Sequence, residues 1–277
     1  MKDRVLIGIA AILAIVTAGV GVALGAFGAG ASDDPSASTG VRPVARATVT
    51  PGRVVVAGRA AHRARRTPVP TALHQPRYGR YFAILEQRRG ARVPMLDSPG
   101  GRLVKSLSGE SEFGSPRVLG VARQSGSWLG VTTPLRPDGE LGWVRFDAAK
   151  LKLYWTRYSL RVLLSKRILE LHYGGRVLGR YTVTVGAAGS DTPRGRFSIT
   201  DALSYDHSPF YGCCALALSG SQEHLPLGWL GGNRIAIHGT PGPVGYAASH
   251  GCIRATDETM RTLFRRVPLG TPVFVDG

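Results

Sequence analysis

Short apolar runs divided by Gly, Pro and Ser limit the fold of this chain more than any other feature. From Tyr81 onward such runs follow one another, among them YFAIL, RVLGVAR, SWLGVTTP, RYTVTVG and TPVFV. Their length and spacing are typical of β-strands bounded by turns. Gly174-Gly175 falls between two of them and predicts a tight hairpin. We therefore expect a mostly β chain with one or two helices.

One segment has the pattern of a helix. Its apolar stripe begins with Met260 and Leu263 and continues at helical spacing, and Thr256 precedes it as a capping residue. Two acidic residues follow the cap, where they suit the positive end of a helix. The pattern ends at Pro268.

The charge balance narrows the choice of partner. The 277 residues include 35 Lys and Arg against 18 Asp and Glu, a formal net charge of +17. This balance suits a polyanionic neighbour such as nucleic acid, anionic lipid or the acidic polymers of a bacterial wall.

The N-terminus indicates which of these partners the chain meets. After Lys2 and Arg4, the stretch from Val5 to Ser32 carries no charge, and about 20 apolar residues let a helix cross a bilayer. We expect residues 1–32 to be a membrane anchor, although Ala29-Gly30-Ala31 keeps a cleaved signal segment open. In both cases the rest of the chain should lie on the extracytoplasmic face of the membrane, secreted if cleavage occurs. Nucleic acid is then not an expected partner.

Residues 33–79 predict a basic, disordered linker. They are rich in Pro, Ala and Arg, and from Arg42 to Arg92 there are twelve arginines and one acid, Glu86. Segments of this composition bury no core. Their charge also suits contact with anionic lipid headgroups or wall polymers.

Residues 80–150 predict a small domain. Their strand-like runs end in GSWLGVTTPLRPDGELGWV, which resembles the end of a bacterial SH3-like domain and implies a small β-barrel. Trp128 and Trp143 in this motif either line a binding groove or pack in the core, and the core is the commoner place for such residues. Residues 151–277 are expected to form a second domain.

Cys252 carries the most informative chemistry of the chain. It lies in SHGCIR, and His238 precedes it by fourteen positions at the end of the strand-like run RIAI. A Gly- and Pro-rich loop joins the two, so they can meet on neighbouring strands as nucleophile and base. Arg254 adds positive potential, which favours a thiolate–imidazolium pair.

The backbone near this pair predicts supporting roles. The N–H groups of Gly251 and Cys252 would hold an oxyanion, and the carbonyl of Gly239 would orient His238. Two other interpretations of the cysteine remain open. It can be structural, or His238, His250 and Cys252 can hold catalytic zinc, although no paired metal-binding motif supports zinc. We expect neither a metal nor a cofactor.

A family resemblance covers residues 151–277. IHGT, a short loop, SHGCIR, a capped helix and PVFV resemble the catalytic domain of the L,D-transpeptidases. The resemblance implies a mostly β sandwich that acts on peptidoglycan stem peptides. It implies that Cys252 is the acylated nucleophile and His238 its proton acceptor and donor. It further implies that Ser249 and Arg254 bind substrate and that His250 and Gly251 shape the site.

The implied reaction is acyl transfer through a Cys252 thioester, from a tetrapeptide stem of the bacterial cell wall to an amine. The product is a cross-link or an attached protein, and water in place of the amine gives L,D-carboxypeptidase activity. A catalytically inactive wall-binding protein and another Cys–His wall peptidase are the alternatives.

Two features of the sequence differ from the expected family pattern. The loop between His238 and Cys252 is shorter. Cys213 and Cys214 are adjacent in a segment expected near the active-site cleft. With three cysteines in an exported chain, at least one thiol is left without an intrachain partner.

Overall fold

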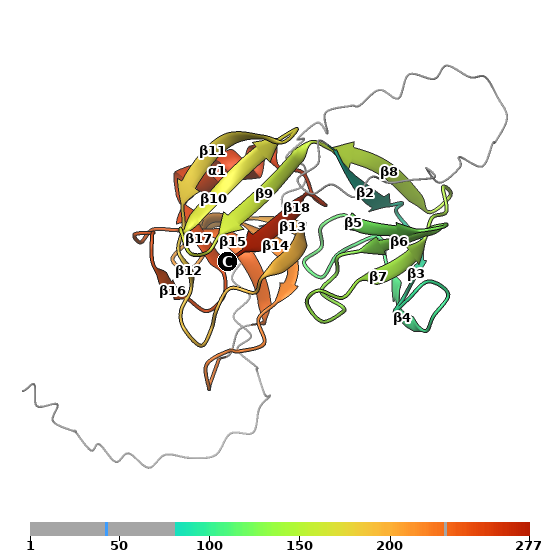
Figure 1. Ribbon diagram of the computed structural model, residues 1–277, viewed down its shortest axis with the longest axis horizontal. Coiled ribbons are helices and arrows are strands. Elements are labelled where there is room, and N and C mark those ends of the chain that lie inside the picture. The colour runs from blue at the N-terminus through green and yellow to red at the C-terminus, as the bar shows by residue number, and fades with distance from the viewer. Residues whose placement is uncertain (1–41, 44–80, 230–231) are drawn as a thin grey trace, which may run out of the picture. The chain divides into compact units, whose positions relative to one another are not determined.

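The computed structural model describes residues 42–43, 81–229 and 232–277 (Figure 1). The predicted membrane segment and most of the predicted linker lie outside these residues. From the linker only β1 (Arg42–Pro43) is described, and it pairs antiparallel with Leu203 and Ser204. In the part of the chain that the structure describes, no helix is both long and apolar enough to span a bilayer.

The first sheet has seven antiparallel strands in the order β4-β3-β7-β6-β5-β2-β8. The strands are β2 (Phe82–Gln87), β3 (Val93–Leu96), β4 (Leu103–Leu107), β5 (Val118–Ser125), β6 (Trp128–Val131), β7 (Gly142–Arg145) and β8 (Leu151–Thr156). Strands β4 and β8 form the two edges, so the hydrogen-bonded ladder is open. The likeness of this region to an SH3-like barrel stays a prediction.

A core of its own stabilises the first sheet. Leu85, Met95 and Leu129 are fully buried in it, and burying one such side chain contributes about 2 kcal/mol. Trp143 is also buried and its ring lies against Gly130, whereas Trp128 is only half-buried. The preference for a core position is therefore confirmed for Trp143.

Strand β8 fixes where the first sheet ends. It pairs with β2 along its whole length, from Leu151 to Thr156. The sequence placed the domain boundary before Leu151, but these residues complete the first sheet through long-range pairing, which local sequence does not reveal.

The second sheet follows the order β11-β10-β9-β18-β13-β14-β15-β17. Its strands are β9 (Tyr158–Leu163), β10 (Ile168–Tyr173), β11 (Arg176–Thr182), β13 (Gly195–Ser208), β14 (Gly212–Ser221), β15 (Arg234–Thr240), β17 (Ile253–Thr256) and β18 (Pro272–Asp276). A short parallel pair, β12 (Val185–Gly186) and β16 (Ala247–Ser249), accompanies it. Gly174 and Gly175 close the predicted β10–β11 hairpin with φ of 61° and 85°, as a type I′ turn requires.

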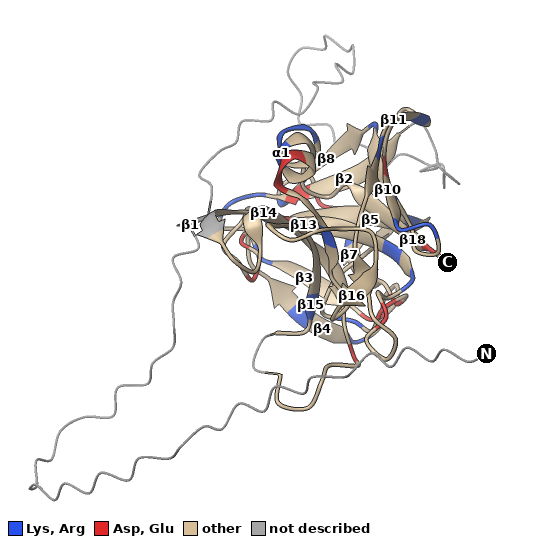
Figure 2. Ribbon diagram, turned by 90° about the vertical axis from the view of Figure 1, so that its left-hand side faces the viewer, with Lys and Arg blue, Asp and Glu red and all other residues tan. Residues whose placement is uncertain are grey.

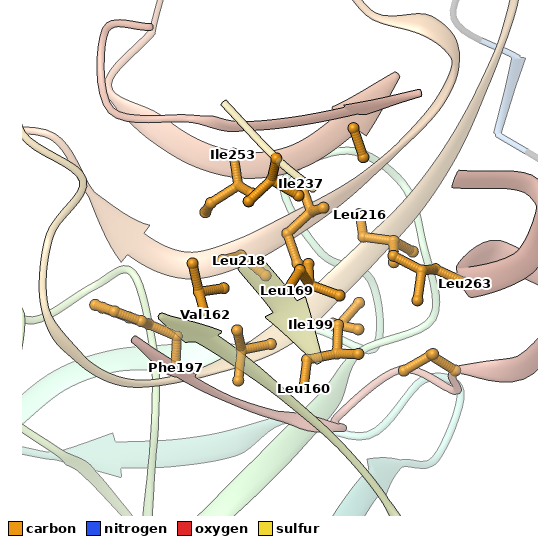
Figure 3. Packing of buried hydrophobic residues seen from close by; sticks show 14 of the residues in the cluster. Leu160, Val162, Leu169, Phe197, Ile199, Leu216, Leu218, Ile237, Ile253 and Leu263 are labelled. Atoms are coloured by element: carbon orange, nitrogen blue, oxygen red, sulfur yellow. The ribbon is translucent and has the colours of Figure 1, made fainter. Parts of the chain in front are cut away.

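Strand β13 joins the two halves of this sheet. Its first residues, Gly195–Ser198, pair with β18, and from Ile199 on it pairs with β14. The halves enclose one core, so the region is a sandwich. Figure 3 shows Leu160 and Val162 on one side of this core and Ile237 and Ile253 on the other.

The helix α1 (Asp257–Arg266) lies where the sequence predicted it. The Thr256 hydroxyl caps it by accepting a hydrogen bond from the Thr259 N–H at 3.3 Å. Met260 and Leu263 are fully buried, and Figure 3 shows Leu263 directed into the core. Figure 2 marks the acidic and basic residues of the helix in red and blue. It is the one α-helix among the described residues.

Candidate active site

Two parallel strands bring the predicted catalytic residues together. In the β15–β17 pair, His238 lies opposite Arg254 and Ile237 opposite Ile253. Because side chains alternate along a strand, Ile237 and Ile253 enter the core while His238 and Arg254 face the other way. Cys252 directly precedes β17. His238, Cys252 and Arg254 all line one pocket of about 250 Å³.

His238 is held as a neutral base. Its side chain is 3% exposed, and Nδ1 lies 2.8 Å from the carbonyl oxygen of Gly239, as predicted from the sequence. A carbonyl can only accept, so Nδ1 carries the hydrogen and Nε2 is left able to accept a proton. Burial, and secondarily the charge of Arg254, lower the pKa of His238 to about 4.

Cys252 is a free, partly buried thiol. Burial raises its pKa, while a backbone hydrogen bond from Ala236 and the charge of Arg254 oppose that rise. Both members of the pair are therefore neutral at rest. This differs from the expected thiolate–imidazolium pair, because burial outweighs the single cation that the sequence revealed.

The turn before Cys252 is tightly supported. The Ser249 side chain is fully buried, and its hydroxyl donates to the Cys252 carbonyl at 2.5 Å. Gly251 has φ of 104°, and a Cβ there would come within 2.5 Å of Gln222 Nε2. The predicted role of Ser249 in binding substrate stays a prediction; with its side chain enclosed, its hydroxyl supports the backbone at Cys252.

His250 contacts another part of the site. It is exposed, and its ring packs against Trp229 with centroids 4.8 Å apart. Trp229 belongs to the segment between β14 and β15, so His250 joins that segment to the turn before Cys252.

Within the described residues, Arg254 has no acidic partner. Its backbone N–H and carbonyl bond to Thr184, each at 2.9 Å, which fixes its position. Its Nε is buried and has no hydrogen-bond partner, and no ion pair to it occurs among the described residues. A guanidinium in this condition is suited to an anionic ligand.

Two supporting residues were missed by the sequence reasoning. Gln222 is buried; it donates from Nε2 to the Asp191 carbonyl at 2.7 Å and accepts from the His224 N–H at 2.8 Å. Asp257 accepts from the Cys213 N–H at 3.0 Å and lies against Gly239. Asp257 was noted only for its place at the helix start, and nothing in the sequence distinguishes Gln222.

Cys213 and Cys214 lie close to the pair, as expected. Their sulfurs are bonded to each other at the start of β14. The next residue, Ala215, lies opposite His238 in the β14–β15 ladder. Over residues 42–43, 81–229 and 232–277, no group of three or more His, Cys, Asp and Glu side chains is arranged to hold a metal ion.

Known proteins match this part of the chain. The profile of the L,D-transpeptidase catalytic domain family matches residues 157–275. A Bacillus subtilis protein named as the L,D-transpeptidase YqjB is 33% identical over 127 residues, 41% of this chain and 69% of that protein. The chain belongs to the L,D-transpeptidase family. A second B. subtilis L,D-transpeptidase homologue, YkuD, is 32% identical over 44% of this chain and 68% of its own length.

Other relatives add context. The Bacillus licheniformis YkuD homologue is 34% identical, and the match covers 43% of this chain and 65% of that protein. A solved L,D-transpeptidase from Mycobacterium smegmatis has a TM-score of 0.35 at 18% identity, over 50% of this chain and 73% of that one. Residues before Arg157 lie outside the family match.

Proposed function

We propose that this L,D-transpeptidase homologue transfers an acyl group from a peptidoglycan tetrapeptide stem through a thioester on Cys252. The proposal rests on one observation above all. His238, with Nδ1 bonded to Gly239 and Nε2 left able to accept a proton, lines the same pocket as the free thiol of Cys252. Nucleophilic catalysis by cysteine needs this combination of thiol and base.

The first step acylates the enzyme. His238 Nε2 takes the thiol proton as Sγ attacks the carbonyl of the L,D-configured peptide bond before the terminal D-Ala. Backbone N–H groups of Gly251 and Cys252 receive the developing negative charge on that oxygen. The bond to nitrogen breaks, and D-Ala leaves with the proton from His238.

The second step returns the thiol. An amine attacks the thioester, His238 accepts its proton, and the C–S bond breaks to release a new amide and the Cys252 thiol. If water attacks instead, the product is a shortened stem, and the enzyme acts as an L,D-carboxypeptidase. The neutral resting pair suits this scheme, since the proton moves only as the carbonyl is attacked.

Arg254 is proposed to bind a carboxylate of the stem peptide. Its guanidinium lines the pocket, and within the described residues it has no acidic partner to neutralise it. A bidentate pair with a carboxylate would satisfy it. Ser249 then acts by supporting the turn before Cys252, and His250 acts through its contact with Trp229.

The setting of the enzyme is also a proposal. We propose that residues 1–32 anchor the chain in the membrane, that residues 33–79 span into the cell wall, and that catalysis takes place on the extracytoplasmic face. The net charge of +17 supports a polyanionic surrounding.

The test is D-Ala release from a tetrapeptide stem by the full-length protein, beside Cys252→Ala. We expect release by the wild type only, and a new amide when an amine is added. Release of internal peptide fragments would favour another Cys–His wall peptidase. Wall binding without any product from peptide would favour an inactive binding protein.

A further inference from the structure

We propose that the loop between β4 and β5, residues 108–117, is part of the active site, and that Phe113 at its tip is a specificity-determining residue that contacts the bound peptide. The loop belongs to the first sheet, outside the family match. The inference rests on the proposed function for the identity of the peptide, but the position of Phe113 does not depend on it.

Phe113 lines the pocket that contains the nucleophile. It shares this pocket with His238, Cys252 and Arg254, although it precedes Cys252 by more than a hundred residues. Its side chain is only partly buried, so part of the ring is left for a ligand. The first sheet thus supplies a wall of a site whose chemistry lies on the second.

The loop has a defined internal structure. A hydrogen bond from the Arg117 N–H to the Gly109 carbonyl, at 2.8 Å, joins the two ends of the loop. A second one, from the Ser111 N–H to the Ser115 carbonyl at 2.8 Å, closes its tip. Arg117 Nε also donates to the Ser108 carbonyl at 2.6 Å. Such cross-bracing makes the loop a preformed element rather than a flexible connection.

Charged and polar contacts hold this loop on the catalytic sheet. Glu112 pairs with Arg234 at 2.6 Å, and the Arg234 guanidinium lies 5.7 Å from the centre of the Phe113 ring. Ser111 donates its hydroxyl to the carboxylate of Asp201, which is fully buried.

Arg234 itself is fixed from the other side. Its guanidinium donates to the Leu218 carbonyl at 2.6 Å and to the Thr200 hydroxyl at 2.8 Å, and its side chain is 10% exposed. Arg234 starts β15, the strand that carries His238. The position of Phe113 is therefore coupled to the catalytic strand by one buried cation.

The lining of the pocket indicates what Phe113 meets. Phe113, Phe210, Tyr211 and Trp229 supply aromatic surface, and Arg254 supplies a cation. This combination fits a short peptide that carries methyl side chains and a carboxylate. We assign to Phe113 the apolar part of that contact.

The experiment compares full-length wild type, Phe113→Ala and Leu103→Ala. Leu103 is an exposed apolar residue on β4 of the same sheet and does not line the pocket. Two quantities are measured for each protein. One is the ratio of Cys252 alkylation rates by N-phenylmaleimide and by iodoacetamide, with the label located by mass spectrometry. The other is KM and kcat for D-Ala release from a tetrapeptide.

For Phe113→Ala we expect the alkylation ratio to rise about threefold or more, because a wall of the pocket is removed. We expect KM for the peptide to rise about fivefold with a smaller change in kcat, because an apolar contact with the bound peptide is lost. Leu103→Ala should match wild type in both. Glu112→Gln keeps the Phe113 ring but weakens the Glu112–Arg234 ion pair that holds the loop. It should shift the alkylation ratio and KM in the same direction by a smaller amount.

Wild-type values of both quantities in folded Phe113→Ala would overturn the proposal. A fall in kcat at constant KM would also overturn it, since the ring would then act on the transition state alone and not on the bound peptide. If even wild type releases no D-Ala, the proposed function fails. The alkylation ratio alone then decides whether Phe113 walls the pocket.

Discussion

At the scale of the residue, the buried imidazole sets the dependence on pH. Burial and Arg254 hold the pKa of His238 at about 4, whereas an unfolded histidine titrates near pH 6.5. As pH falls from about 6.5 to about 4, the unfolded chain takes up a proton that the folded chain does not. Folding should therefore lose up to about 3 kcal/mol of stability over this window.

Catalytic activity should also depend on the protonation state of His238. We expect kcat/KM for the peptide to hold steady from neutral pH downward and to fall with a limb near pH 4. His238→Gln should abolish turnover and remove that part of the pH dependence of urea unfolding. An acid limb near the ordinary histidine pKa, or the same stability loss in His238→Gln, would show that burial does not control His238.

Gly251 should tolerate no side chain. A methyl group there meets both the positive φ and Gln222, so Gly251→Ala should displace the turn and slow acylation of Cys252 by about tenfold or more. Gly189→Ala is the matched control, since Gly189 has φ of 84° with open space around it. Equal acylation rates in the two variants would mean that contact with Gln222 is unimportant.

At the scale of the element, the helix directly follows the strand that positions Arg254. Its cap is a single hydroxyl, from Thr256 to the Thr259 N–H. Thr256→Ala should lower the free energy of unfolding by about 1 kcal/mol, whereas Thr256→Ser keeps the acceptor and should cost less. Chemical denaturation measures both. Equal loss in the two variants would assign the effect to the methyl group instead of the cap.

The elements that could be predicted from sequence are those with local causes. The helix has a cap and an apolar stripe, the β10–β11 hairpin has two glycines, and His238 and Cys252 stand out by residue type. Gln222, Asp257 and Phe113 could not be predicted as site residues, because each reaches the site through pairing of distant segments. The neutral state of His238 and Cys252 could not be predicted for the same reason, since burial is a property of the folded chain.

At the scale of the whole molecule, the many basic residues should together contribute to binding of anionic wall polymers. If the linker and the charged surface hold the protein on anionic wall polymers, binding of the full chain to isolated cell walls should fall about threefold or more between 0.05 and 0.5 M salt, because screening shortens the reach of each charge. Binding that is insensitive to salt would point to recognition by shape or apolar contact.

The proposed function requires that one thiol of this molecule becomes acylated. The most direct measurement is the intact mass of full-length protein after incubation with a carbapenem, for wild type and Cys252→Ala side by side. We expect a single covalent adduct on the wild type and none on the variant. An adduct on both proteins, or on neither when wild type is folded and Cys252 is reduced, would contradict it.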